Sequence, residues 1–498
     1  MKSYLLAIDV GTSGVKLLLM HRSGEPCFTV TQAYPTHYPA EGWAEQDPRA
    51  WWRAISCGVG KLLKDARVQA GEIGAIGVDG VSWTPVMLDA TGHVLANTPL
   101  WYDRRATQAC VELRERMGEE RAFALSGNPI QPYYTLPKVM WFCKNRPDVM
   151  ARTRHILSSN GYVVYRLTGA ITQDFSQAYG WHFFDMQNRR WDMPQAQALG
   201  IEPDWLPPLC ESSAVAGVVS AAVAEETGLC AGTPVVAGGL DAACGALGAG
   251  VIGDGPVHEQ SGSAGGMSVC TAVYRPARGL ILGCHVVPGR WLVQGGTVGG
   301  GGVMRWLQGV LYPQGDVRGD SLAELSCAAK GVAPGADGVL FLPYMAGERS
   351  PIWDPDAKGV YYGLDFGKGR GHLVRAAMEG AAFALRHNLD AARDAGNGIG
   401  VLHAVGGASR SELWMQIKAD VTGHPIRAVD SAEATGMGCA ILAGVGAGIY
   451  PGFEAACARL VRLGAPYMPQ EESGRTYERQ YERYLQLYRM LKDMMKGC

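Results

Sequence analysis

The sequence predicts an α/β protein with two domains, and three observations support this. Apolar strands, glycine-containing turns and helical segments alternate along the chain, which is typical of the α/β class. At 498 residues, the chain is longer than one hydrophobic core normally supports. An acid-bearing strand, a glycine turn and a second strand occur at residues 5–20 and again at residues 257–268. This recurrence indicates an internal duplication, with one copy in each domain.

The charge balance limits the classes of partner. Lysine and arginine number 45 against 47 acidic residues, a formal net charge of −2, so no overall basic field exists to bind nucleic acid or an anionic membrane. The 13 cysteines have no repeated C-x-x-C spacing, which argues against a disulfide framework or a zinc site. We expect a small-molecule ligand and local phosphate binding.

Two features predict a soluble cytoplasmic protein. The first apolar run already contains Asp9 and the glycine turn, which leaves no room for a cleavable signal peptide. The longest charge-free run, residues 434–453, is rich in glycine and alanine, so a buried helix is expected there instead of a membrane span.

Residues 5–20 predict a β-hairpin suited to phosphate. Its turn combines glycines with hydroxyl side chains: Gly11, Thr12, Ser13 and Gly14. The glycines allow backbone N–H groups to face an anion, and the hydroxyls add donors. Asp9 ends a buried strand, where a carboxylate is unfavourable unless it is paired or binds a cation such as magnesium on a nucleotide. The alternative is an ordinary hairpin with an isolated acid.

The next elements alternate between helix and strand. A helix is expected at about residues 48–69, with Asp47 as its cap, followed by strands at residues 73–78 and 85–88. A charged helix then runs from Trp101 to about Met117. Residues 126–192 are irregular and rich in aromatic residues, so this stretch is either a cap over a substrate or a packed loop region.

Asp241 follows the buried strand at residues 232–240 and precedes a helix of small residues. Catalytic groups of α/β proteins gather at the carboxyl ends of strands, so Asp241 is a candidate catalytic residue. The alternative reading of Asp241 is a helix N-cap.

The second half begins near residues 251–255 and repeats the acid-bearing hairpin. A glycine run at residues 295–302 leads into a helix, so backbone can approach a ligand at a helix N-terminus. We therefore expect domains at residues 1–248 and 249–498. An amphipathic helix is expected at about residues 474–496, docked on the body of the protein.

Five segments together resemble the FGGY family of carbohydrate kinases over essentially the whole chain. They are GWAEQDP at 42–48, LPYMAGERSP at 342–351, GVYYGL at 359–364, HLVRAAME at 372–379 and GGASR at 406–410. The pair at 359–364 and 372–379 is the most specific, because it fits the family's C-terminal signature at every fixed position. The resemblance implies two ribonuclease-H-like domains of the actin and sugar-kinase superfamily, closing on ATP and a sugar.

The resemblance also implies roles for individual residues. Asp9 would hold Mg²⁺, and Asp241 would be the catalytic base that takes the proton of a sugar hydroxyl. The remaining nucleotide-binding residues would be Gly11, Thr12, Ser13, Lys16, Gly262, Ser263, Gly301, Gly407, Ala408 and Ser411. A homodimer is the family's common assembly.

The chain departs from the pattern of its nearest relatives within the family at residues 81–84. These relatives carry a Gln-Met-His-Gly segment there, and this chain has Val-Ser-Trp-Thr. The usual substrate-binding Met-His pair is therefore missing, and such a change can alter selectivity by orders of magnitude. By position, Ser82, Trp83, Trp101 and Asp103 would face the sugar together with Asp241. The alternative for Trp83 is core packing alone.

The resemblance implies an ATP-dependent kinase that phosphorylates a terminal hydroxyl of a ketopentose, with D-xylulose as the first candidate. Other acceptors within the family are ribulose, gluconate, erythritol and glycerol. A different class, an actin-like ATPase, predicts no acid at position 241, and a sugar sensor is expected to have lost Asp9 or Asp241. Both acids are present.

Overall fold

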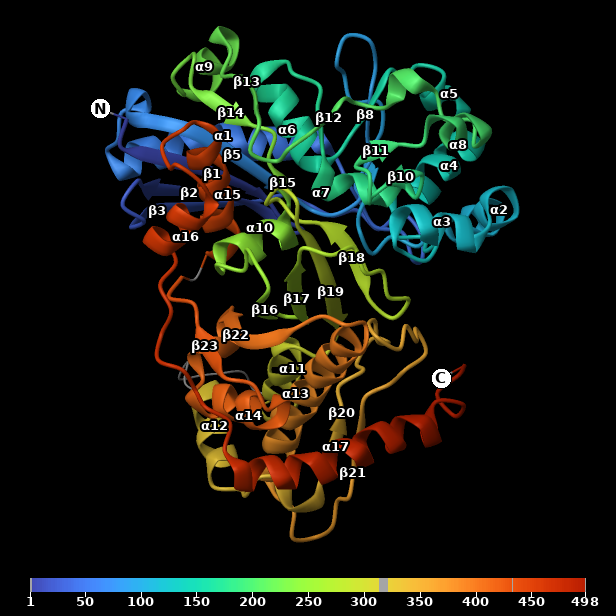
Figure 1. The fold of residues 1–498 in the computed structure, drawn as a ribbon, viewed down its shortest axis with the longest axis vertical. Coiled ribbons are helices and arrows are strands. Elements are labelled where there is room, and N and C mark those ends of the chain that lie inside the picture. The colour runs from blue at the N-terminus through green and yellow to red at the C-terminus, as the bar shows by residue number, and fades with distance from the viewer. Residues whose placement is uncertain (1, 313–320, 432, 498) are drawn as a thin grey trace.

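The computed structural model describes residues 2–312, 321–431 and 433–497, whose two large β-sheets lie one above the other in Figure 1. Helices surround and separate the sheets, and the predicted α/β class is confirmed. Within the described residues, no helix combines the length and apolar character needed to cross a membrane.

The first sheet has seven strands in the order β13-β14-β5-β1-β2-β3, with β15 also paired to β5. Their bounds are β1 (Tyr4–Val10), β2 (Gly14–His21), β3 (Pro26–Ala33), β5 (Ile73–Gly80), β13 (Val215–Val218), β14 (Pro234–Val236) and β15 (Gly239–Leu240). β1 and β2 form the expected antiparallel hairpin, while β5 lies parallel to β1. Strands β1, β5 and β15 therefore end at the same edge.

The second sheet repeats this arrangement in the order β18-β19-β17-β16-β22-β23. Its strands are β16 (Gly255–Ser261), β17 (Gly265–Thr271), β18 (Ile281–Cys284), β19 (Trp291–Thr297), β22 (Ile399–Val405) and β23 (Ile426–Ala428). β16 and β17 are an antiparallel hairpin and β22 is parallel to β16, as β5 is to β1. The duplication expected from the sequence is thus present in the topology.

Two small-residue helices, α10 (Asp241–Gly248) and α15 (Ala434–Gly446), pack directly against each other. A Cβ on Gly438 would lie 1.9 Å from the carbonyl oxygen of Cys244, so the two backbones are in contact. A Cβ on Gly77 of β5 would lie 2.3 Å from the carbonyl oxygen of Cys439. Although α15 follows the second sheet in the chain, it packs against the first, beside β1 and β2 in Figure 1.

The helices differ from expectation mainly at their ends. α1 (Pro48–Ala66) starts at the predicted Pro48 and ends at Ala66; the next residue, Arg67, adopts the left-handed conformation (φ 55°). α2 (Thr107–Met117) starts six residues later than expected from Trp101, because Asp103 and Arg105 are held in a buried loop. α17 (Glu471–Leu491) lies along the second half, burying Tyr477 and Tyr484 completely.

The remaining helices and strands form smaller layers around the sheets. Those that matter for the site are α4 (Thr135–Asn145), α7 (Phe175–Ala178), α11 (Gly301–Leu311), α13 (Arg370–Asp394) and α14 (Glu412–Thr422). β6 (Val86–Leu88), expected as a strand, pairs with β8 (His155–Leu157) and lies outside both main sheets.

Candidate active site

Two adjoining cavities lie between the halves of the protein. The first, which we call the aromatic cavity, has a volume of about 290 Å³ and is lined by residues that include Thr12, Ser82, Trp83, Trp101, Tyr179, Asp241, Gly262, Ser263, Gly296 and Arg349. The second, the acidic cavity, has a volume of about 350 Å³ and is lined by residues that include Asp9, Lys16, Asp241, His258, Gly262, Gly406 and Glu433. Asp241 and Gly262 border both cavities, so they stand where the two meet.

Asp241 follows β15 directly and begins α10. Burial raises the pKa of its carboxyl group to about 7, and the nearby Asp9 contributes to this rise. The amide of Ala242 donates to its Oδ1 at 2.7 Å. A carboxyl group with a pKa near neutrality can accept a proton at neutral pH.

The backbone before Asp241 is held by a buried polar network that the sequence did not reveal. The Leu240 amide donates to Ser176 Oγ at 2.8 Å, and the Ser176 hydroxyl donates to Asp174. Asn160 Nδ2 donates to Asp174 at 2.9 Å and to the carbonyl of Ala237 at 3.1 Å. This network holds β15, and with it the position of Asp241.

Asp9 and Asp79 are opposite each other on the parallel strands β1 and β5. Burial raises the pKa of both carboxyl groups, and that of Asp79 lies well above its ordinary value. Both oxygens of Asp79 are buried, and the Asp9 carboxyl and the Cys439 thiol are the side chains that interact with them. Lys16, opposite Asp9 on β2, forms an ion pair of 2.6 Å with Glu433. The acidic cavity therefore holds several carboxyl groups around one lysine.

The two glycine turns face this region from opposite halves. In the first turn, the Trp101 indole donates to Thr12 Oγ1 at 3.2 Å, and Gln46 Nε2 donates to the Thr12 carbonyl at 2.7 Å. In the second, the amides of Gly301 and Gly302 donate to the carbonyls of Gly262 and Ser263 at 2.7 and 2.8 Å. The turns are thus braced by other segments.

Several predicted nucleotide contacts line neither cavity: Gly11, Ser13, Gly301, Gly407, Ala408 and Ser411. Gly301 instead contacts the second turn, where a Cβ would lie 2.7 Å from the Gly262 oxygen. Ser411 caps α14, its Oγ accepting the amide of Trp414 at 3.4 Å. Gly406, which the sequence did not single out for this role, borders the acidic cavity with a φ of 97°, a conformation that favours glycine.

Trp83 both packs and lines the aromatic cavity. Its ring lies 4.5 Å from that of Tyr134 and 5.7 Å from that of Tyr179, centroid to centroid. Its φ of 54° is unusual for a bulky residue, and such strain tends to occur at functional sites. Its Nε1 is buried close to the Tyr179 hydroxyl, with which it interacts.

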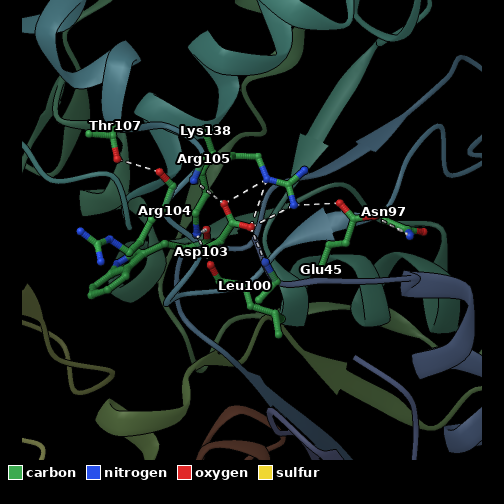
Figure 2. Close-up of polar contacts among 10 residues, drawn as sticks. Glu45, Asn97, Leu100, Asp103, Arg104, Arg105, Thr107 and Lys138 are labelled. Atoms are coloured by element: carbon green, nitrogen blue, oxygen red, sulfur yellow. Dashed lines mark hydrogen bonds and ion pairs between the residues drawn. The ribbon is translucent and has the colours of Figure 1, made fainter. Parts of the chain in front are cut away.

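The sequence predicts that Asp103 faces the sugar, but the structure places it away from the aromatic cavity. It is completely buried and does not line the aromatic cavity. Arg105 Nε donates to its Oδ1 at 3.0 Å, and the Ala44 amide donates to its Oδ2 at 2.6 Å. Figure 2 shows the Arg105 guanidinium between Asp103 and Glu45, which it contacts at 2.8 Å. Because both oxygens of Asp103 are occupied, it orders the loop beside Trp101.

Lys138 on α4 is, like Asp103, a completely buried charged residue of this region, and Figure 2 labels both. Its ammonium donates to the carbonyls of Trp83 and Leu100 at 2.9 and 2.8 Å. Burial lowers its pKa to about 7. Lys138 therefore joins the two loops that carry Trp83 and Trp101. Its one sequence signal is a lysine within the largely apolar run at residues 136–143.

The described residues contain no group of three or more His, Cys, Asp or Glu side chains arranged to hold a metal ion by themselves. Mg²⁺ usually keeps several waters and binds one or two carboxylates together with substrate phosphates. Asp9 is buried at the edge of the acidic cavity. It can therefore serve as the single carboxylate that shares a Mg²⁺ ion with phosphates and water.

Comparison with known proteins shows similarity over the full chain. The models for the N-terminal and C-terminal domains of the FGGY family of carbohydrate kinases match residues 4–248 and 264–447. The chain is 30% identical to xylulose kinase of Bacillus subtilis strain 168 (99% of this chain, 98% of that protein) and 27% identical to gluconokinase of the same organism (99% and 97%). The crystal structure of xylulose kinase from Rhodospirillum rubrum superposes with a TM-score of 0.89 at 29% identity, covering 99% of each chain.

Proposed function

Because the chain belongs to the FGGY family of carbohydrate kinases, we propose that it transfers the γ-phosphoryl group of ATP to a terminal hydroxyl of D-xylulose. The observation that carries this proposal is the position of Asp241, which borders the aromatic cavity and the acidic cavity at once. A hydroxyl in the first cavity and a phosphoryl group in the second would meet at this carboxylate. The full-length similarity to xylulose kinases supports D-xylulose as the acceptor.

Asp241 acts as the general base in this proposal. A primary hydroxyl is a poor nucleophile at neutral pH, and a carboxylate within hydrogen-bond reach removes its proton as the phosphoryl group moves in line. The pKa of about 7 suits this task, since the group is substantially ionised at neutral pH and still basic enough to take the proton.

The phosphates of ATP lie between the two glycine turns. Thr12 and Ser13 of the first turn and Ser263 of the second supply hydroxyl donors, and Lys16 supplies positive charge. Lys16 pairs with Glu433, so phosphate binding exchanges one anionic partner for another. Gly407, Ala408 and Ser411 are proposed to contact the nucleoside.

Mg²⁺ would be held by Asp9, directly or through water, and by the phosphates, and it would neutralise charge that develops during transfer. Desolvation already raises the pKa of Asp9, and a cation relieves the cost of a buried carboxylate. Ser82, Trp83 and Trp101 face the sugar, with Asp103 and Lys138 ordering the loops behind them.

The family resemblance also supports a homodimer that works in the cytoplasm on a small sugar. Size-exclusion chromatography with light scattering tests the dimer, which predicts twice the 53.2 kDa chain mass. A single-chain mass overturns it.

A coupled ADP-release assay tests the proposed function. The purified protein receives magnesium-ATP and each of D-xylulose, D-ribulose, D-gluconate, erythritol and glycerol, alongside Asp241→Asn and the exposed control Asp254→Asn. We expect D-xylulose to give the highest kcat/KM, Asp241→Asn to lower it by about 10²–10⁴-fold, and Asp254→Asn to match the wild type. Preference for another acceptor contradicts the substrate. ADP release that no acceptor stimulates contradicts sugar phosphorylation.

A further inference from the structure

Arg349 is a positively charged residue that lines the aromatic cavity and lies outside both glycine turns. It follows β20 (Leu340–Leu342) in the segment 342–351 and comes from the second half of the protein, opposite Trp101 of the first. Among the described residues that line this cavity, Arg349 is the sole lysine or arginine. It is thus the one full positive charge among the described residues of this cavity, and such a charge favours an anionic group over a neutral hydroxyl.

The contacts of Arg349 leave its donors free. Its guanidinium carbon lies 5.4 Å from the centroid of the Trp101 ring, an interaction that uses the face of the group and leaves the N–H edge available. No side-chain hydrogen bond or ion pair of Arg349 is formed within the described residues. Burial lowers the pKa of Arg349 from its ordinary value, because the charged guanidinium is partly removed from water.

The neighbouring carboxylate of Glu348 attracts the guanidinium electrostatically, but the two side chains form no hydrogen bond or ion pair among the described residues. Glu348 accepts the Thr297 hydroxyl on Oε2 and the Val298 amide on Oε1 at 2.9 Å. Both of its oxygens are thereby committed to the segment that leads into the glycine run. Glu348 thus orders the backbone while Arg349 enters the cavity.

The position of Arg349 relates it to both glycine turns. Trp101, against which it stacks, donates to Thr12 in the first turn. On the other side, a Cβ on Gly296 would lie 2.7 Å from Arg349 Nη2, so the guanidinium rests on this glycine. Gly296 is the register partner of Gly266, which follows the second turn closely. Arg349 therefore lines the same cavity as Asp241 and residues of both turns, and it does not line the acidic cavity.

We propose that Arg349 binds the phosphoryl oxygens once they are on the acceptor sugar, making it a recognition residue for the phosphorylated product. An arginine presents several N–H donors in a planar fork that matches phosphate oxygens. This inference rests on the proposed kinase function and extends it to the product state. A carboxylate of a sugar acid has similar chemistry, and the test separates the two.

Isothermal titration calorimetry tests the proposal. Saturating magnesium-ADP fills the nucleotide site, so that an added anion binds only outside it, in the aromatic cavity. The wild type, Arg349→Gln, Arg349→Lys and Arg479→Gln, an exposed arginine of α17, each receive two phosphate ligands, D-xylulose 5-phosphate and inorganic phosphate, and in a separate titration D-gluconate. We expect Arg349→Gln to weaken binding of both phosphate ligands by about tenfold or more, as loss of charge-assisted hydrogen bonds implies. Arg349→Lys should lose less, and Arg479→Gln should match the wild type.

Three outcomes overturn the proposal. The first is unchanged affinity for both phosphate ligands in Arg349→Gln. The second is an equal loss of magnesium-ADP affinity in that variant, which indicates a structural role. The third is selective loss of D-gluconate binding, which assigns Arg349 to the carboxylate of an acid substrate. Because inorganic phosphate binding does not depend on the sugar's identity, it separates failure of this inference from failure of the D-xylulose assignment.

Discussion

Asp241 shows how much one residue depends on its surroundings. An exposed aspartate titrates near pH 4, but burial and the proximity of Asp9 raise the pKa of Asp241 to about 7. A general base works in its deprotonated form, so its activity is complete above the pKa and falls as the pH drops below it. The rate should therefore follow the ionisation of this carboxyl group.

We expect kcat/KM for the acceptor to be level above about pH 7.5 and to fall about tenfold per pH unit well below pH 7. The pH profile of kcat/KM reports groups of the free enzyme, so it follows this carboxyl group before substrate binds. A coupled assay from pH 5 to 9 measures it, with Asp254→Asn as a control that keeps the profile. A level profile down to pH 5 contradicts the raised pKa.

Removing the base should also reduce turnover more than nucleotide binding. Asp241→Asn keeps the size of the side chain and loses the proton acceptor, and general-base catalysis contributes about 10²–10⁴-fold. We expect kcat to fall by this factor while the Kd for magnesium-ATP, measured by calorimetry, changes less than threefold. A comparable loss of ATP affinity would instead indicate that Asp241 is mainly a metal or phosphate ligand.

At the scale of elements, the crossing of α10 and α15 depends on glycine. Gly438→Ala places a Cβ 1.9 Å from the Cys244 carbonyl oxygen, and backbone on a packed helix cannot yield locally. Gly60 of α1 is exposed, and a Cβ added there would have no atom within 4 Å. The same substitution should therefore have opposite effects at the two glycines.

We expect Gly438→Ala to lower the melting temperature clearly or to prevent soluble expression. Gly60→Ala should stabilise α1 by about 0.5–1 kcal/mol, because glycine costs that much relative to alanine in a helix. Differential scanning calorimetry of both variants measures this. Equal melting temperatures for the two would show that α15 can move away from α10.

At the scale of the whole molecule, buried contacts join the two halves. Asn128 Nδ2 donates to the carbonyl of Leu282 on β18 at 2.7 Å, and the Leu282 amide donates to Asn128 Oδ1 at 3.0 Å. Asn128 is completely buried. One side chain thus forms a reciprocal pair of hydrogen bonds to the second sheet.

Asn128→Ala should loosen this junction, since each buried polar group left unpaired costs about 1–3 kcal/mol. We expect faster hydrogen exchange at the Leu282 amide and a lower melting temperature. The exposed Asn145→Ala, on the end of α4, serves as the control. Unchanged exchange at Leu282 would contradict a role for Asn128 in holding the halves together.

The sequence by itself determined the α/β class, the duplicated hairpin and the family, because these follow from local apolar patterns and from motifs whose residues are contiguous. It also singled out Asp9 and Asp241, since an acid at the end of a buried strand is conspicuous. The tertiary structure alone decided the partners of Asp103, the bridging role of Lys138 and the entry of Arg349 into the cavity. Arg349 is more than 240 positions from Trp101, and α15 packs on strands from the opposite end of the chain. Side-chain direction and long-range packing depend on which distant segments meet, and no local pattern records that.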